Sequence, residues 1–234
     1  MDWKFWLLTY PSGIIGGSIL QLFRLPGLVK IKNRERLPKD LSGCILASNH
    51  PSLWEPILLP LSIFFWKYLF HPTKYAPWSV ADKENYFQKW RWIYFVVKSR
   101  LLAVNRKDKR EAIEALSEMR RLVQAGKILI IFPEGGRTEK GAEVLTSPKG
   151  NRIRPLQNGV GIIAQKRRGD KLVPKIIPIW VSGSDKVLPI GKKLPKLWKE
   201  TEIKIGKPII PNGESVTDLT KIITQQLLNL ADEN

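Results

Sequence analysis

The stretch GCILASNHPSLWEPILL, residues 43–59, joins an apolar run to a group of polar side chains. The run GCILAS is short and bounded by polar residues, which predicts a buried strand. The segment that follows, SLWEPILLPLSIFF, predicts a helix that its prolines bend or shorten. His50 lies at the end of the strand, and Glu55 follows one helical turn beyond Pro51. This junction is the first candidate site.

The segments downstream alternate between strand and helix patterns. KILIIFPEGG, residues 127–136, is a continuous apolar run typical of a strand buried on both faces. A helix is predicted before it, with a stop at Gly126 and apolar residues at helical spacing: Ile113, Leu116, Met119, Leu122 and Val123. Residues 137–157 predict a polar loop, and NGVGIIAQKRR a helix. KLVPKIIPIWVSG predicts another buried strand, TEIKIGKPI a strand near the edge, and residues 215–234 an amphipathic helix.

Strands that alternate with helices predict an α/β fold. We expect a single domain, residues 31–234, with a central mostly parallel or mixed sheet flanked by helices. The 234 residues suffice for one substantial core.

The N-terminal segment, residues 1–30, predicts a membrane-associated helical segment. It is rich in Trp, Phe and Leu, and Pro11 and Gly13 interrupt its apolar run. We expect two short helices, broken near Pro11–Gly13, that lie in the membrane interface. An ordinary helix packed on the core and a single spanning helix are the alternatives.

The chain is strongly basic, with 39 Lys and Arg, 21 Asp and Glu, and a formal net charge of +18. Such a charge favours an anionic partner: nucleic acid, an acidic membrane surface or a phosphorylated substrate. The nine tryptophans favour the membrane. The sequence contains no recognisable nucleic-acid-binding motif, although the aromatic and basic stretch 86–98 keeps that class as a rival. Cys44 is the only cysteine and reads as a buried structural thiol.

Two strand ends carry side chains that suit catalysis. In open α/β sheets, sites lie outside the carboxyl ends of strands, so His50 and the Glu134–Arg137 segment could share one cleft. An imidazole there can take a proton from a hydroxyl when a carboxylate such as Glu55 orients it. The chain's other histidine, His71, is also followed by proline but has alanine at position 76.

NHPSLWE followed by FPEGGRT resembles the glycerolipid acyltransferases of the lysophosphatidic acid acyltransferase type. The hallmark of this family is a histidine, four residues and an aspartate, then a downstream glutamate–glycine–any–arginine block. Weaker resemblances extend over roughly residues 40–210: WSVADKENYF, LLAVNR, NGVGIIA, VPKIIPIWVSG and IKIGKPI. The aspartate of the family is Glu55 here, and Arg100 stands where the second block normally has glycine.

The resemblance implies transfer of a fatty acyl group from a thioester, acyl-CoA or acyl carrier protein, to lysophosphatidic acid, which forms phosphatidic acid. His50 and Glu55 match the catalytic pair, and no metal or cofactor is expected beside the thioester co-substrate. The expected acceptor-phosphate site consists of Glu134, Gly135, Arg137 and Arg106. The implied partners are the lysophospholipid, the thioester and anionic lipids, with no nucleic acid, and the expected location is the cytoplasmic face of a membrane.

Two alternatives stay open at this point. The acceptor could be another lysophospholipid or glycerol 3-phosphate. The alternative to an enzyme is a non-catalytic anionic-lipid-binding protein with the same fold, in which the longer Glu55 side chain misplaces the imidazole.

Overall fold

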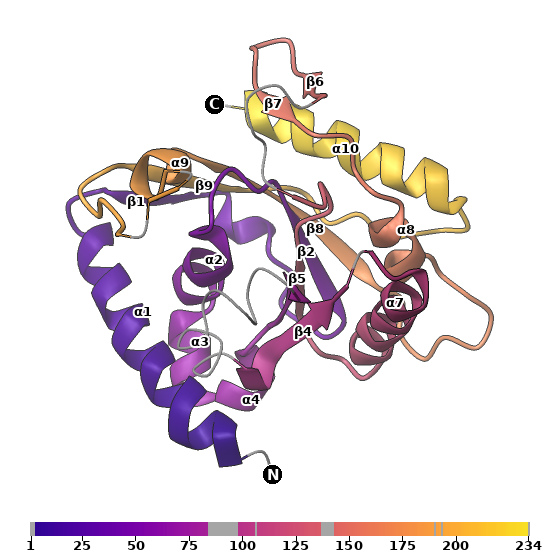
Figure 1. Cartoon of the computed structure of the whole chain (residues 1–234), viewed down its shortest axis with the longest axis horizontal. Helices are drawn as coiled ribbons and strands as arrows, with labels where there is room; N and C mark the ends of the chain where they lie inside the picture. Colours follow the sequence, from indigo (N-terminus) through magenta and orange to yellow (C-terminus); the bar gives the residue numbers. More distant parts are fainter. Residues whose placement is uncertain are drawn as a thin grey trace.

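The computed structural model describes residues 3–83, 98–105, 107–136, 143–189, 191–192 and 194–233 (Figure 1). Within these ranges, seven strands form one mixed sheet, in the order β1-β9-β8-β2-β5-β3-β4. All neighbouring strands are parallel except β8 and β9, which run antiparallel. The bounds of the sheet strands are β1 Val29–Lys32, β2 Cys44–Ser48, β3 Trp78–Asp82, β4 Leu101–Val104, β5 Leu129–Ile131, β8 Lys175–Ser182 and β9 Thr201–Ile205.

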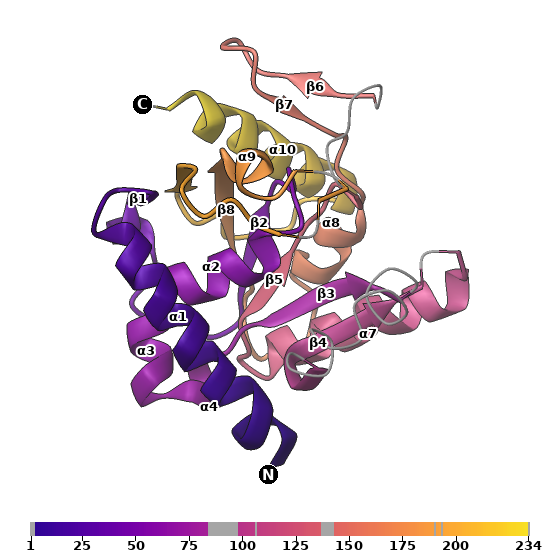
Figure 2. The same cartoon turned by 60° about the vertical axis from the view of Figure 1, so that its left-hand side comes forward.

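Helices cover both faces of the sheet, which confirms the predicted α/β fold. Figure 2 shows α1, α2 and α3 on one side and α7, α8 and α10 on the other. The bounds of the helices are η1 Phe5–Thr9, α1 Tyr10–Arg24, η2 Arg34–Arg36, α2 Glu55–Ile63, α3 Phe65–Phe70, α4 Pro72–Tyr75, η3 Lys98–Arg100, α7 Lys109–Gln124, α8 Gly159–Ala164, α9 Ser184–Val187 and α10 Val216–Asp232.

The central strands are buried on both faces. In β2, Ile45 and Ala47 belong to the core beneath α7, α8 and α10, whereas Cys44 and Leu46 belong to the core beneath α1 and α2. Successive side chains of a strand point to opposite faces, so both sets must be apolar. This explains why β2, β5 and β8 read as continuous apolar runs.

The helix α7, Lys109–Gln124, ends where its sequence pattern predicts. Asp108 caps it, because its Oδ1 atom accepts hydrogen bonds from the N–H groups of Arg110 (2.8 Å) and Glu111 (3.2 Å). Gly126 follows the last turn with a φ of 73°, a left-handed conformation that glycine adopts without strain. The predicted C-terminal helix is likewise confirmed as α10, Val216–Asp232.

Two features were missed in the sequence. The short strand β1 pairs with β9, which therefore lies one strand in from the edge, in agreement with its predicted place near the edge. β1 also straddles residue 30, where we placed the domain boundary; that division itself stays a prediction. The polar loop contains a small hairpin of β6 (Leu145–Thr146) and β7 (Arg152–Ile153). Strands of two to four residues are too short for alternation to be recognised.

The N-terminal segment forms one continuous helix, so the predicted break near Pro11–Gly13 is wrong. The π-helical turn η1 leads directly into α1. Pro11 is the second residue of α1 and directly follows this π-helical turn, where the helical hydrogen-bond pattern changes. None of the helices among the described residues combines the length and apolar character that crossing a bilayer requires.

The glycines of α1 serve close packing. A Cβ atom on Gly13 would lie 2.7 Å from Cε1 of Tyr68, and one on Gly17 would overlap the ring of Phe65. Both aromatic residues belong to α3. The helices α1 and α3 approach closely because these two positions of α1 carry no side chain.

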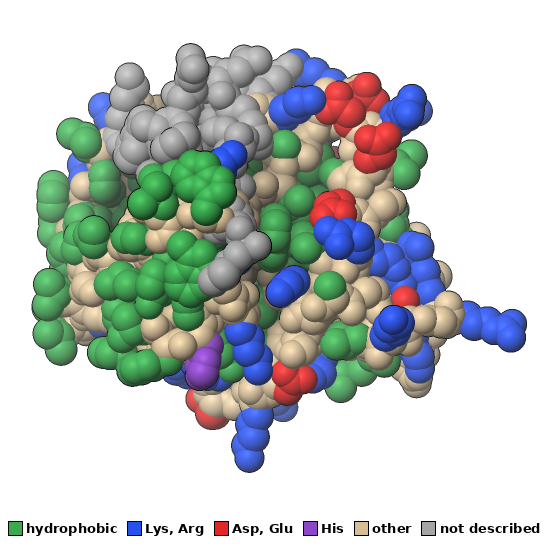
Figure 3. Space-filling model, turned by 90° about the horizontal axis from the view of Figure 1, so that it is seen from below, with side chains coloured by type: hydrophobic (Ala, Val, Ile, Leu, Met, Phe, Trp, Pro, Cys, Tyr) green, Lys and Arg blue, Asp and Glu red, His purple; other side chains and the backbone are tan. Residues whose placement is uncertain are grey.

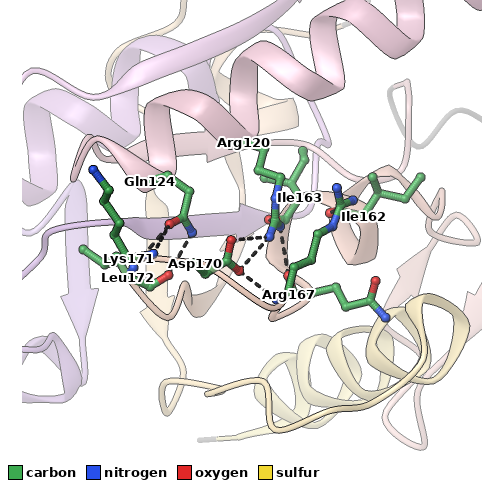
Figure 4. Close-up of polar contacts among 9 residues, drawn as sticks. Arg120, Gln124, Ile162, Ile163, Arg167, Asp170, Lys171 and Leu172 are labelled. Atoms are coloured by element: carbon green, nitrogen blue, oxygen red, sulfur yellow. Dashed lines mark hydrogen bonds and ion pairs between the residues drawn. The ribbon is translucent and has the colours of Figure 1, made fainter.

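A buried ion pair ties α7 to the connection between α8 and β8 (Figure 4). Arg120 donates through Nη2 to both carboxylate oxygens of Asp170, at 2.7 and 2.6 Å. Its Nη1 atom donates to the carbonyl oxygens of Ile163 (3.0 Å) and Gln165 (2.9 Å). Asp170 also accepts the N–H of Arg167 at 2.7 Å. One arginine therefore fixes the course of the chain between α8 and β8.

We predict that Arg120→Met lowers the free energy of unfolding by about 3 kcal/mol, because it leaves the Asp170 carboxylate buried without its partner. Arg121→Met is the matched control: this neighbouring side chain is 68% exposed, against 11% for Arg120. Its loss should stay within about 0.5 kcal/mol. Urea unfolding of both variants measures the difference, and equal losses would contradict a structural role for the pair.

Candidate active site

The carboxyl ends of β2 and β5 lie side by side. The two strands are parallel, with Ala47 opposite Ile131. The residues that follow them therefore meet at one edge of the sheet, as the sequence predicts. Asn49 continues the sheet at this edge with its side chain. Its Oδ1 atom accepts the N–H of Val181 (2.7 Å), and its Nδ2 atom donates to the carbonyl oxygen of the same residue (2.9 Å).

His50 contacts Glu55 directly. The His50 Nδ1 atom lies 2.8 Å from Glu55 Oε2, at the first residue of α2. A carboxylate only accepts hydrogen bonds, so Nδ1 carries the proton and Nε2 keeps its lone pair. None of the described residues hydrogen-bonds to Nε2. The imidazole therefore has its basic nitrogen available, and its side chain is 13% exposed.

The Glu55 carboxylate is fully buried and receives two further hydrogen bonds. Ser52 donates its N–H to Oε2 (3.1 Å) and its hydroxyl to Oε1 (2.9 Å). Ser52 Oγ in turn accepts the N–H of Trp54 at 3.0 Å. These bonds fix the carboxylate against the imidazole, although the side chain is one methylene longer than aspartate.

Sequence reasoning missed the part that Ser52 plays. The order Ser-x-x-Glu was readable at residues 52–55, and in this pattern a glutamate often bonds back to the N–H of the serine. That contact is present here, and the same glutamate also reaches the histidine. The pattern was ambiguous because it is typical of ordinary helix starts.

The loop after β5 completes the surroundings of His50. The ring of Phe132 stacks on the imidazole, with a centroid distance of 4.3 Å and an interplanar angle of 23°. Glu134 Oε1 accepts the backbone N–H of His50 at 2.7 Å, and its Oε2 accepts the N–H of Arg154 at 2.9 Å. Glu134 is 1% exposed. Its carboxylate thus holds two backbone segments together.

The two glycines of the loop after β5 meet different structural requirements. Gly135 has a φ of 73° and donates its N–H to the carbonyl oxygen of Phe132 at 3.1 Å, which closes a tight turn. Gly136 leaves room for a neighbour, since a Cβ atom there would lie 2.7 Å from Nη1 of Arg154. A guanidinium group therefore lies against the loop. Arg154 was not among the site residues predicted from the sequence.

The remaining predicted residues fall in different places. Arg106 and Arg137 lie outside the described residues. His71 is exposed at the junction of α3 and α4, with its ring 6.3 Å from that of Tyr75. Within the described ranges, no three His, Cys, Asp or Glu side chains are grouped so that they could hold a metal ion.

Comparison with known proteins identifies the family and the fold. Residues 28–182 match the family model described as acyltransferase. The fold is similar to the crystal structure of the 1-acyl-sn-glycerophosphate acyltransferase of Thermotoga maritima, with a TM-score of 0.64, 19% identity, and coverage of 95% of this chain and 78% of that one.

Two curated relatives are 26% identical to the chain. A chloroplastic 1-acyl-sn-glycerol-3-phosphate acyltransferase of Brassica napus matches over 76% of this chain and 44% of its own length. The taffazin of Dictyostelium discoideum matches over 77% of this chain and 62% of its own length. The matched region is thus less than two thirds of each relative. The family model covers well over half of this chain, and the protein belongs to the acyltransferase family.

Proposed function

We propose that the protein transfers a fatty acyl group from a thioester to the free hydroxyl of lysophosphatidic acid, forming phosphatidic acid. The observation that carries this proposal is the contact of His50 Nδ1 with the buried Glu55 carboxylate, while no described residue hydrogen-bonds to Nε2. Membership of the acyltransferase family and the printed names of the relatives support the reaction class. The donor is acyl-CoA or acyl carrier protein.

In the proposed mechanism, His50 acts as a general base. Its Nε2 atom takes the proton of the acceptor hydroxyl while the oxygen attacks the thioester carbonyl. The tetrahedral intermediate collapses with loss of the thiolate, which receives the proton back from the imidazolium. Glu55 holds the tautomer and stabilises the imidazolium charge. An ester and a free thiol are the products.

Two further residues support direct transfer without an acyl-enzyme. Ser52 is fully buried, and its hydroxyl is already donated to Glu55. Cys44 is also fully buried, and burial raises the pKa of its thiol to about 11, so little nucleophilic thiolate forms at neutral pH. Neither side chain is suited to carry the acyl group.

The acceptor phosphate is proposed to bind at the loop after β5. Arg137 is the first candidate ligand because its planar guanidinium can hold a phosphate through two hydrogen bonds. Gly135 belongs to the same loop, and Arg106 is a second candidate. Glu134 contributes by position, because its oxygens already accept the N–H groups of His50 and Arg154. A site of this kind suits a phosphomonoester, so it favours lysophosphatidic acid over acceptors whose phosphate is esterified twice.

The non-catalytic alternative loses its main support. It assumed that the longer Glu55 side chain misplaces the imidazole, yet the carboxylate lies 2.8 Å from Nδ1. A measurement of free thiol released from acyl-CoA distinguishes the transferase from the non-catalytic alternative. Release that requires lysophosphatidic acid supports the transferase, and binding of lipid without release supports the alternative.

We also propose that the face formed by α1 and α3 docks on a membrane. Figure 3 shows hydrophobic side chains gathered on this face. The exposed members on the N-terminal helices and α3 are Trp3, Leu7, Ile15, Ile19, Leu22, Leu25, Trp66 and Phe70. An open groove at its edge is lined by Arg24, Lys30 and Trp66, which suits anionic head groups. The segment 149–175 carries eight Lys and Arg residues and includes α8, which lies on the other side of the sheet from α1 (Figure 2).

His50→Ala should lower acyl transfer by about 10²–10⁴-fold, because it removes the base. His71→Ala is the matched control, since this histidine is exposed and also precedes a proline. It should leave most of the activity. Initial rates of thiol release measure both variants, and unchanged urea unfolding shows that they are folded. A dead His71 variant beside an active His50 variant would overturn the assignment.

Glu55→Gln should lower turnover by about 100-fold or more, whereas Glu55→Asp should retain more activity. An amide offers only one oxygen acceptor, so it cannot satisfy the His50 ring and both donors of Ser52 at once. Aspartate keeps the charge and is the residue of the family pattern. Turnover of the two variants at saturating substrate checks this prediction, which fails if the Gln variant matches the wild type.

Leu7→Gln combined with Leu22→Gln should weaken binding to anionic vesicles by about 100-fold, because each inserted leucine contributes about 1.5 kcal/mol. Deleting residues 2–25 is a poor test, because Phe5 and Leu20 are 1% and 3% exposed and belong to the core. Ile113→Gln on α7 is the control, as its side chain is 63% exposed outside this face. Vesicle flotation measures binding, and equal effects of both changes would contradict docking through α1.

A further inference from the structure

Arg154 is held against the candidate site by its backbone. Its N–H donates to Oε2 of Glu134 at 2.9 Å, and Glu134 Oε1 accepts the N–H of His50 at 2.7 Å. A second bond runs parallel to this one, from the N–H of Gln157 to the carbonyl oxygen of Pro133 at 2.8 Å. The chain after β7 therefore lies along the loop after β5. The Glu134 carboxylate bridges the backbone N–H groups of Arg154 and His50.

The side chain of Arg154 returns to the same loop. Its Nη1 atom occupies the space where Gly136 has no Cβ, at 2.7 Å from the position that a Cβ would take. Gly136 directly precedes Arg137 in the sequence. The guanidinium group is thus fixed beside the loop that the family pattern associates with the acceptor phosphate.

The charge of Arg154 is not neutralised by a carboxylate among the described residues. Three other arginines, by contrast, each form an ion pair: Arg120 with Asp170, Arg36 with Glu233 and Arg121 with Glu118. Arg154 is half-buried and its guanidinium has no ion-pair partner in the described part of the chain. A guanidinium that is partly removed from water gains from an anion with two acceptor oxygens.

We propose that Arg154 binds the phosphate group of the acyl acceptor and contributes to selection of phosphomonoesters. The inference rests on the proposed function and deepens it. In lysophosphatidic acid the phosphate lies only a few bonds from the hydroxyl that must reach Nε2 of His50. The phosphates of CoA are separated from the thioester by the long pantetheine arm. A guanidinium fixed beside Gly136, in the loop whose Glu134 also binds the backbone N–H of His50, therefore suits the acceptor.

Arg154→Gln tests this role, because glutamine keeps much of the side-chain length and the backbone N–H but loses the charge. The KM for lysophosphatidic acid should rise about 10- to 100-fold, as expected for loss of charge-assisted hydrogen bonds. The turnover number, the KM for acyl-CoA and the KM for a monoacylglycerol, which has no phosphate, should stay unchanged. Arg154→Lys should recover part of the affinity.

Arg152→Gln is the matched control. Arg152 is exposed and lies two residues away on β7, and its substitution removes the same charge. A rise in the acceptor KM of the Arg154 variant alone supports the inference. Equal rises in both variants, or a rise confined to the KM for acyl-CoA, would overturn it.

A calorimetric titration of the wild type and both variants with glycerol 3-phosphate separates this inference from the proposed function. Weaker binding in the Arg154→Gln variant alone supports the phosphate role whether or not acyl transfer is detected. Absence of transfer by the wild type to every acceptor would refute the proposed function. An active wild type with equal glycerol 3-phosphate affinity in all three proteins would refute only the role of Arg154.

Discussion

The carboxylate of Glu134 fixes the geometry on which the candidate site depends. Its two oxygens accept the backbone N–H groups of His50 and Arg154, which are separated by about a hundred residues in the chain. The side chain is 1% exposed, so water does not compete for these bonds. Removal of the carboxylate would leave two N–H groups without an acceptor. The glutamate thus secures where the ends of β2 and β7 lie.

Glu55 applies the same principle to a side chain. Its carboxylate is also buried, and it combines two bonds from Ser52 with the contact to the His50 ring. One carboxylate therefore orients the imidazole and the other positions its backbone. A histidine held at both its ring and its backbone has little freedom to leave the geometry that proton transfer requires.

The sequence predicted the parts of the fold that local patterns determine. The strands β2 and β5, the helix α7 and the meeting of His50 with Glu55 follow from runs and spacings within a few residues. The parts that it did not predict depend on distant partners. Glu134 bonds to the N–H of Arg154, 20 residues away, and Asn49 pairs with Val181, 132 residues away. The glycines of α1 resembled helix breakers because the rings of α3 that they accommodate lie about fifty residues further on.

The close packing of α1 links the position of the exposed apolar face to the position of the catalytic pair. Gly13 and Gly17 lock α1 to α3, which follows α2 almost without a break, and the first residue of α2 is Glu55. The exposed apolar face and the catalytic pair are therefore connected through α3 and α2. If α1 docks on the membrane as proposed, its depth among the head groups also sets the height of the His50 imidazole above the lipid. Bilayer thickness and lipid packing would then change the rate of the reaction by moving the His50 imidazole relative to the acceptor hydroxyl. The site itself would not change.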